Sequence, residues 1–105
     1  MTIASNMLSD NSTTIININN EFKLLNNLFK SNGWDKIENN DKLSEHITYS
    51  KKENETEFFE ITLLNNNIYV SVPLKNSVFQ YKTKFTDYYS AIKYTEDKFI
   101  YFIEN

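Results

Sequence analysis

The residues that could carry out chemistry in this chain are few, and His46 is its only histidine. A metal site built from two histidines is therefore impossible within one chain. The lack of cysteine excludes disulfides, thiolate metal ligands and thiol nucleophiles. A catalytic Ser/His/Asp triad would need His46 at the start of a predicted strand, and no Gly-x-Ser-x-Gly turn presents a serine. We interpret His46 as an exposed strand residue.

Carboxylates are concentrated around the start of a predicted strand, at Glu53, Glu55, Glu57 and Glu60. A carboxylate pair could act as general acid and base if burial raised one pKa. However, Glu57 and Glu60 have opposite parity in a strand and point to opposite faces. The single glycine cannot build a phosphate-binding loop. We therefore expect a solvated acidic surface, no catalytic residues, no metal and no cofactor.

Length and composition set the broad class of the protein. The 105 residues are 40% hydrophobic and 24% charged, with a formal net charge of −3. This length supports one hydrophobic core. No apolar run approaches the roughly 20 residues that a membrane span requires, and the first residues lack the basic and apolar regions of a signal peptide. We expect a soluble intracellular protein that is neither secreted nor inserted in a membrane.

Amino-acid usage in the chain is biased. Asparagine occurs 16 times, all 11 basic residues are lysine, and glycine and proline occur once each. The favoured residues have AT-rich codons, so the bias indicates an AT-rich genome such as those of giant amoebal viruses, some protists and some low-GC bacteria. This origin weakens any functional interpretation of the asparagine runs.

The N-terminal segment lacks a sustained hydrophobic period. Residues 1–18 predict a mobile arm, although Ile15, Ile16 and Ile18 leave a short edge strand as an alternative. The rest of the chain, residues 19–105, has no internal repeat and no linker, so we expect it to form a single domain.

A helix is predicted over residues 21–32 because its apolar residues recur at spacings of three and four. They are Phe22, Leu25, Leu28 and Phe29. Asn19 or Asn20 can cap its first turn, and Gly33 suits the left-handed position that follows a helix. Trp34 would then pack on the end of this helix in the core, rather than act as a stacking platform for a ligand.

A polar loop is expected over residues 35–45, followed by four strands. The strands are predicted at 46–51, 57–64, 67–73 and 78–85. In each strand apolar residues alternate with polar ones, which is typical of an antiparallel sheet covered on one face. The inward residues are Ile47, Tyr49, Phe59, Ile61, Leu63, Ile68, Val70, Val72, Phe79, Tyr81 and Phe85.

The parity of the inward residues fixes one hairpin. Ile61 and Val70 must share a face, which a two-residue turn at Asn65 and Asn66 satisfies because asparagine tolerates positive φ. Pro73 cannot donate a ladder hydrogen bond, so regular pairing on its side should end near the preceding residue.

The last segment, 86–103, fits one helix with an apolar stripe. Thr86 can be its N-cap, with Asp87 placed favourably against the helix dipole. The competing interpretation is a fifth strand over 98–103, which is rich in aromatic and β-branched residues. The expected fold is α+β: a helix, a four-stranded antiparallel meander and a helix, with both helices on the apolar face of the sheet.

The uncovered face of this sheet supplies the candidate partner surface. Its residues are Phe58, Glu60, Thr62, Tyr69, Ser71, Lys82 and Lys84. We expect a non-enzymatic module that binds another protein as an adaptor or pairs with a second copy. The alternative is single-stranded nucleic acid stacked on Tyr69 beside Lys82 and Lys84. An acidic chain without arginine disfavours that alternative, although residues 73–98 carry a net charge of +2.

Overall fold

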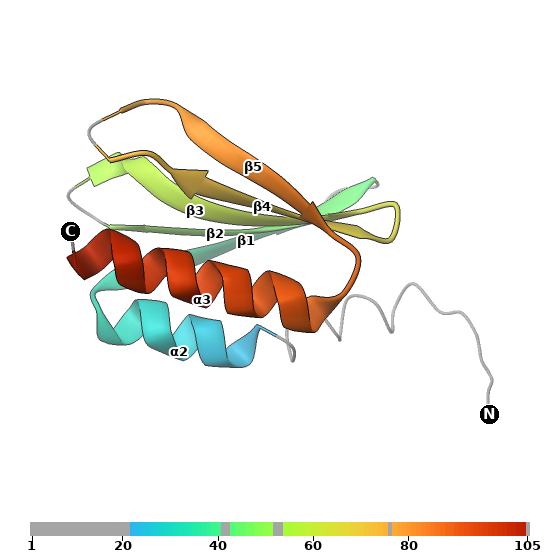
Figure 1. The fold of residues 1–105 in the computed structure, drawn as a ribbon, viewed down its shortest axis with the longest axis horizontal. Helices are drawn as coiled ribbons and strands as arrows, with labels where there is room; N and C mark the ends of the chain where they lie inside the picture. Colours follow the sequence, from blue (N-terminus) through green and yellow to red (C-terminus); the bar gives the residue numbers. More distant parts are fainter. Residues whose placement is uncertain (1–21, 41–42, 52–53, 76, 105) are drawn as a thin grey trace.

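The computed structural model describes residues 22–40, 43–51, 54–75 and 77–104 (Figure 1). The predicted arm over 1–18 and the predicted caps Asn19 and Asn20 lie outside the described residues. The elements are α2 (Lys23–Ser31), β1 (Trp34–Asn40), β2 (Ser44–Lys51), β3 (Asn54–Leu64), β4 (Asn67–Pro73), β5 (Gln80–Phe85) and α3 (Tyr88–Glu104). The predicted α+β class, with an antiparallel sheet flanked by two helices, is confirmed.

Within the described ranges the sheet has five strands in the order β1-β2-β3-β4-β5, all antiparallel. The prediction of a loop over 35–45 was therefore wrong, since β1 and the start of β2 occupy most of it. Hydrophobic alternation could not reveal β1, because its helix-side positions include Lys36 and Glu38. These two side chains form an ion pair, with 2.6 Å between Lys36 Nζ and Glu38 Oε2.

The predicted hairpin between β3 and β4 is confirmed. Asn65 and Asn66 have φ angles of 51° and 65°, and the register places Ile61 opposite Val70. β4 ends at Pro73, which pairs with Gln80 at the start of β5. Pairing thus stops one residue later than predicted, and β5 starts two residues later.

The corner between α2 and β1 depends on the only glycine in the chain. Gly33 has a φ of +82°, and its backbone N–H donates to the carbonyl of Lys30 at 3.0 Å. The predicted left-handed ending of the helix is confirmed. Trp34 follows directly, is buried, and meets Phe29 edge to face with 5.8 Å between ring centroids. Trp34 is therefore a core residue, as expected.

The C-terminal segment is one continuous helix, α3, so the alternative of a fifth strand over 98–103 was wrong. The predicted N-cap, Thr86, was also wrong. The carboxylate of Asp87 accepts the backbone N–H of Ser90 at 2.7 Å, which is the contact that an N-cap makes with the third helical residue. α3 accordingly begins one residue later than predicted.

Both helices lie on the same face of the sheet, as predicted (Figure 1). Between them and the strands lies a cluster of aromatic rings. The ring of Phe29 stacks parallel to that of Tyr49 with 4.0 Å between centroids. The ring of Phe99 lies at the same centroid distance from Phe29 but is tilted relative to it. These rings fill the space beneath β2 and β3, and neither of the two described helices covers the opposite face of the sheet.

Candidate functional site

The sequence-predicted partner surface lies on the face of the sheet that the helices do not cover. The register gathers six of its residues into two rows across β3, β4 and β5, with Phe58 beyond them on β3. The rows are Glu60–Ser71–Lys82 and Thr62–Tyr69–Lys84. The predicted residues are therefore neighbours, as strand parity implied.

This surface is only partly available to a partner. Lys82 and Lys84 are exposed, whereas Phe58 and Tyr69 are half-buried. Ser71 is only 5% exposed, so its side chain presents almost nothing to an incoming molecule. The two lysines on β5 are the accessible part of the predicted surface.

His46 belongs to a hydrogen-bonded cluster on the same face and is half-buried, so its interpretation as an exposed residue was wrong. Its Nε2 lies 2.8 Å from Ser44 Oγ, and its Nδ1 lies 3.1 Å from Thr62 Oγ1. Glu60 Oε2 is farther from Nδ1, at 3.9 Å. A catalytic triad requires the acid to hold the Nδ1 hydrogen, and here a threonine hydroxyl is the closer group. We therefore explain the cluster as structural hydrogen bonding within β2 and between β2 and β3.

Among the residues that the structure describes, no three histidine or carboxylate side chains gather where they could hold a metal ion. This face offers hydrogen-bonding groups, the positive charges of Lys82 and Lys84, and the negative charge of Glu60.

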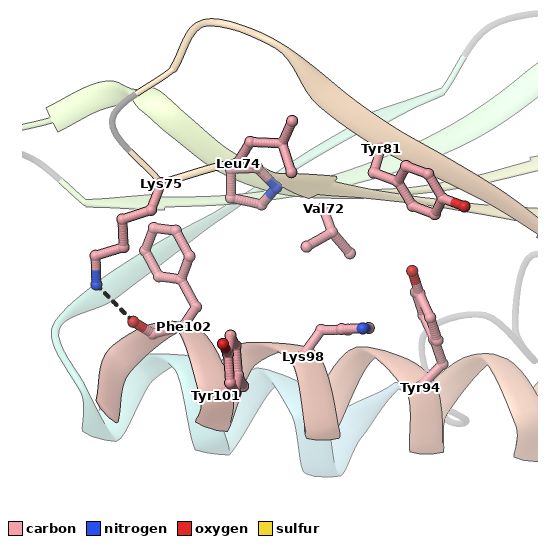
Figure 2. A pocket seen from close by; sticks show the side chains of 9 residues that line it. Val72, Leu74, Lys75, Tyr81, Tyr94, Lys98, Tyr101 and Phe102 are labelled. Atoms are coloured by element: carbon pink, nitrogen blue, oxygen red, sulfur yellow. Dashed lines mark hydrogen bonds between the residues drawn. The ribbon is translucent and has the colours of Figure 1, made fainter. Parts of the chain in front are cut away.

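A second surface, which the sequence did not predict, is a cavity of about 360 Å³ between the β4–β5 side of the sheet and α3. Figure 2 shows Val72 projecting from the strands toward α3 and Tyr94 projecting from α3 toward the strands, while Lys98 extends along the helix toward Tyr94. The lining residues are Val72, Pro73, Leu74, Lys75, Tyr81, Tyr94, Lys98, Tyr101 and Phe102. The walls are mainly apolar and aromatic.

The cavity exists because α3 packs mainly on β4 and leaves β5 largely uncovered. Val72 and Tyr81 are paired in register and share the helix-side face. Val72 is only 8% exposed, whereas Tyr81 is 62% exposed. Tyr81 thus lies on the predicted face of the sheet, but the prediction that Tyr81 and Phe79 belong to the core was wrong. Phe79 precedes β5 and is 71% exposed.

Two contacts hold the walls of the cavity together. Lys75 Nζ donates to the backbone carbonyl of Phe102 at 2.7 Å and lies 4.5 Å from the centre of its ring (Figure 2). At the other end, Thr83 Oγ1 donates to the hydroxyl of Tyr94 at 3.2 Å. The strands and α3 are thus joined on both sides of the opening. Between them, Lys98 Nζ lies 5.5 Å from the centre of the Tyr94 ring.

β5 is also an edge strand of the sheet as described. An edge strand has backbone N–H and C=O groups that no neighbouring strand pairs. The segment from Pro73 to Phe85 contains three lysines and no acidic residue. Three of the apolar side chains that line the cavity are exposed, namely Leu74, Tyr81 and Tyr101. We call the edge of β5 together with this cavity the β5 groove.

No protein-family model matches the chain, and comparisons with curated proteins and with solved structures gave no match. Neither α2 nor α3, the two helices in the described part of the chain, is long and apolar enough to cross a membrane. Function is therefore argued from the geometry of this chain alone.

Proposed function

We propose that the protein is a non-enzymatic binding module that takes up an extended segment of another protein in the β5 groove. The observation that carries this proposal is the position of the cavity beside an open strand edge. Strand addition uses such an edge for main-chain hydrogen bonds and adjacent pockets for side chains. We place this binding inside a cell, a setting that suits a chain without cysteine.

The exposed apolar side chains support a binding role. A contiguous apolar patch on a protein surface commonly marks an interaction site. Here Tyr81 and Tyr101 are both largely exposed and line the same cavity. A partner seated between them would remove aromatic surface from water, which is the main source of affinity at such sites.

The lysines of β5 argue against a second copy of this chain as the partner. If two β5 edges paired about a two-fold axis, the lysines of both copies would lie side by side on one face of the joined sheet. Like charges at cross-strand positions are destabilising. Lysine on an edge strand is also a common protection against self-pairing. A partner of different sequence avoids this repulsion, so we favour the adaptor role over the homodimer.

Panning a library of random twelve-residue peptides against the full chain tests the proposal. We expect binders whose addition shifts the amide resonances of β5 and of the α3 residues facing the cavity. Tyr81→Ser should weaken these binders, whereas Tyr89→Ser should not, because Tyr89 is exposed on α3 and does not line the cavity. Binders that leave the β5 resonances unchanged, or the lack of any binder, would refute the proposal.

Light scattering after size exclusion tests the choice of partner. We expect a monomer even at high protein concentration. A dimer that Tyr81→Ser converts to monomer would show that the β5 groove receives a second copy, and would overturn the assignment to a different protein.

A second candidate function is the binding of single-stranded nucleic acid on the uncovered face of the sheet. The favouring observation is the register, which sets Tyr69 directly opposite Lys84 and so combines a stacking ring with a cation. Fluorescence anisotropy with labelled single-stranded DNA and RNA at low salt tests it. Binding at tens of micromolar that Tyr69→Ser abolishes and Tyr81→Ser preserves would support it, and no binding in that range would end it.

A further inference from the structure

Resting on the proposed function, the geometry of the β5 groove points to the chemistry of the segment that binds there. We infer that the segment alternates large apolar residues with aspartate or glutamate. Its apolar side chains face the cavity, and its carboxylates lie beside Lys82 and Lys84.

Alternation follows from strand addition. Successive side chains of a strand point to opposite faces of the sheet, and β5 offers a different surface on each face. Tyr81 is on the helix side, at the rim of the cavity, while Lys82 and Lys84 are on the uncovered side. A strand beside β5 therefore contacts apolar surface with every second residue and positive charge with the residues between.

The helix side selects large apolar side chains. The cavity volume of about 360 Å³ lies within the range of pockets that bury ligands. Val72 and Phe102 form buried walls, while Tyr81 and Tyr101 remain exposed at its opening. A side chain entering between the two tyrosines would bury surface on both of them. The two lysines that line the cavity already contact other groups, Lys75 the carbonyl of Phe102 and Lys98 the ring of Tyr94, so the surface between the two tyrosines favours an apolar side chain.

The uncovered side selects acidic side chains. Lys82 and Lys84 stand opposite Ser71 and Tyr69 on β4, neither of which carries a neutralising charge. In the described part of the chain neither lysine forms a salt bridge. A carboxylate on an added strand would lie opposite one of them, with roughly 4.5–5.5 Å between Cβ atoms.

Two peptides of identical composition separate this inference from general charge attraction. The first is fluorescein-labelled Glu-Phe-Glu-Val-Glu-Phe-Glu, and the second is Glu-Glu-Phe-Val-Phe-Glu-Glu. Their affinities for the full chain are measured by fluorescence anisotropy at about physiological salt. We expect the alternating peptide to bind at least about tenfold more tightly, because only it can match both faces of β5 together.

Protein variants locate the contacts. The double substitution Lys82→Glu and Lys84→Glu should abolish binding of the alternating peptide and create binding of Lys-Phe-Lys-Val-Lys-Phe-Lys. The double substitution Lys23→Glu and Lys30→Glu on α2 makes the same change in net charge at exposed sites that do not line the cavity. It should leave the affinities for the two acidic peptides unchanged. Melting curves of each variant establish that it is folded.

The outcomes distinguish this inference from the proposed function. Equal affinity for the two acidic peptides, or equal weakening by both lysine double variants, would overturn the inference. Library-derived peptides that bind β5 but lack acidic–apolar alternation would also overturn it while leaving the proposed function intact. If no peptide from the library or the defined set binds, both fail.

Discussion

Tyr49 in β2 and Tyr81 in β5 both point to the helix side of one sheet, yet they have opposite environments. Tyr49 is fully buried and stacks on Phe29, whereas Tyr81 is largely exposed at the rim of a cavity. The difference comes from the two helices, which cover β2 and leave β5, at one edge of the sheet, open to solvent. Strand alternation therefore determines the face on which a side chain lies, and helix placement determines whether that side chain is buried.

The two regions consequently serve different purposes. In the covered region, aromatic rings from both helices and from β2 and β3 fill the core and supply stability. At the β5 edge, aromatic side chains of the same kind remain in contact with water, and there we propose that a partner binds. Substitutions in each region can test this division.

The strongest contrast should be between Phe29 and Phe79. Phe29→Ala removes a ring that contacts Tyr49 and Phe99 and should lower the free energy of unfolding by about 3–5 kcal/mol. Phe79→Ala at the exposed edge should change it by less than about 0.5 kcal/mol. Urea denaturation measures both values. Similar losses at the two positions would show that the edge is part of the core.

Alkaline pH should destabilise the protein through Tyr49. Burial, and secondarily the charge of Glu38, raises the pKa of Tyr49 above its ordinary value of 10.0. The folded state then holds its proton more tightly than the unfolded state. The resulting stability is complete below the unfolded pKa and declines as the pH rises above it, by up to about 1.4 kcal/mol per pH unit.

The control for this effect compares two tyrosines. Tyr49→Phe should flatten the decline, and Tyr101→Phe on the exposed flank of α3 should preserve it. Urea midpoints measured from about pH 8 to about pH 11 provide the comparison. A decline that persists unchanged in Tyr49→Phe would assign it to other groups.

A smaller effect is expected at the corner that leads into the covered region. Gly33→Ala should destabilise the fold by about 1–2 kcal/mol, because alanine at a φ of +82° pays a backbone penalty. An added Cβ would meet no atom within 4 Å, so no steric clash contributes. Gly33→Asn should cost less, since asparagine tolerates this conformation. Equal denaturation midpoints for wild type and Gly33→Ala would contradict this account.

The smallest effect concerns the start of α3, the helix that separates the two regions. Asp87→Ala should lower stability by about 1 kcal/mol through loss of the N-cap hydrogen bond to Ser90. Thr86→Ala should have almost no effect. Thermal unfolding of the two variants measures both losses of stability. A larger loss in Thr86→Ala than in Asp87→Ala would show that Thr86 is the N-cap, as the sequence predicted.

The regular parts of the fold were predictable because they follow local rules. The Asn65–Asn66 turn and the pairing of Ile61 with Val70 followed from parity alone. β1 could not be predicted in the same way, because its helix-side Lys36 and Glu38 remove the alternation signal.

The candidate site was predictable only in part. The neighbours of Lys82 and Lys84 on the uncovered face followed from register. The cavity beside Tyr81 depends on where α3 lies relative to β5, and no local pattern in the sequence reports that position. Phe79 and Tyr81, which are exposed, were therefore assigned to the core.

The two contacts that join the strands to α3, from Lys75 to Phe102 and from Thr83 to Tyr94, have a consequence for the energetics of recognition. They link the strands to α3 on both sides of the cavity in the chain by itself. For the binding that we propose, such links would reduce the ordering of the receptor, and most of the entropy lost on association would belong to the incoming segment. A preorganised groove of this kind rewards segments that are already extended in solution over those that must first unfold a helix.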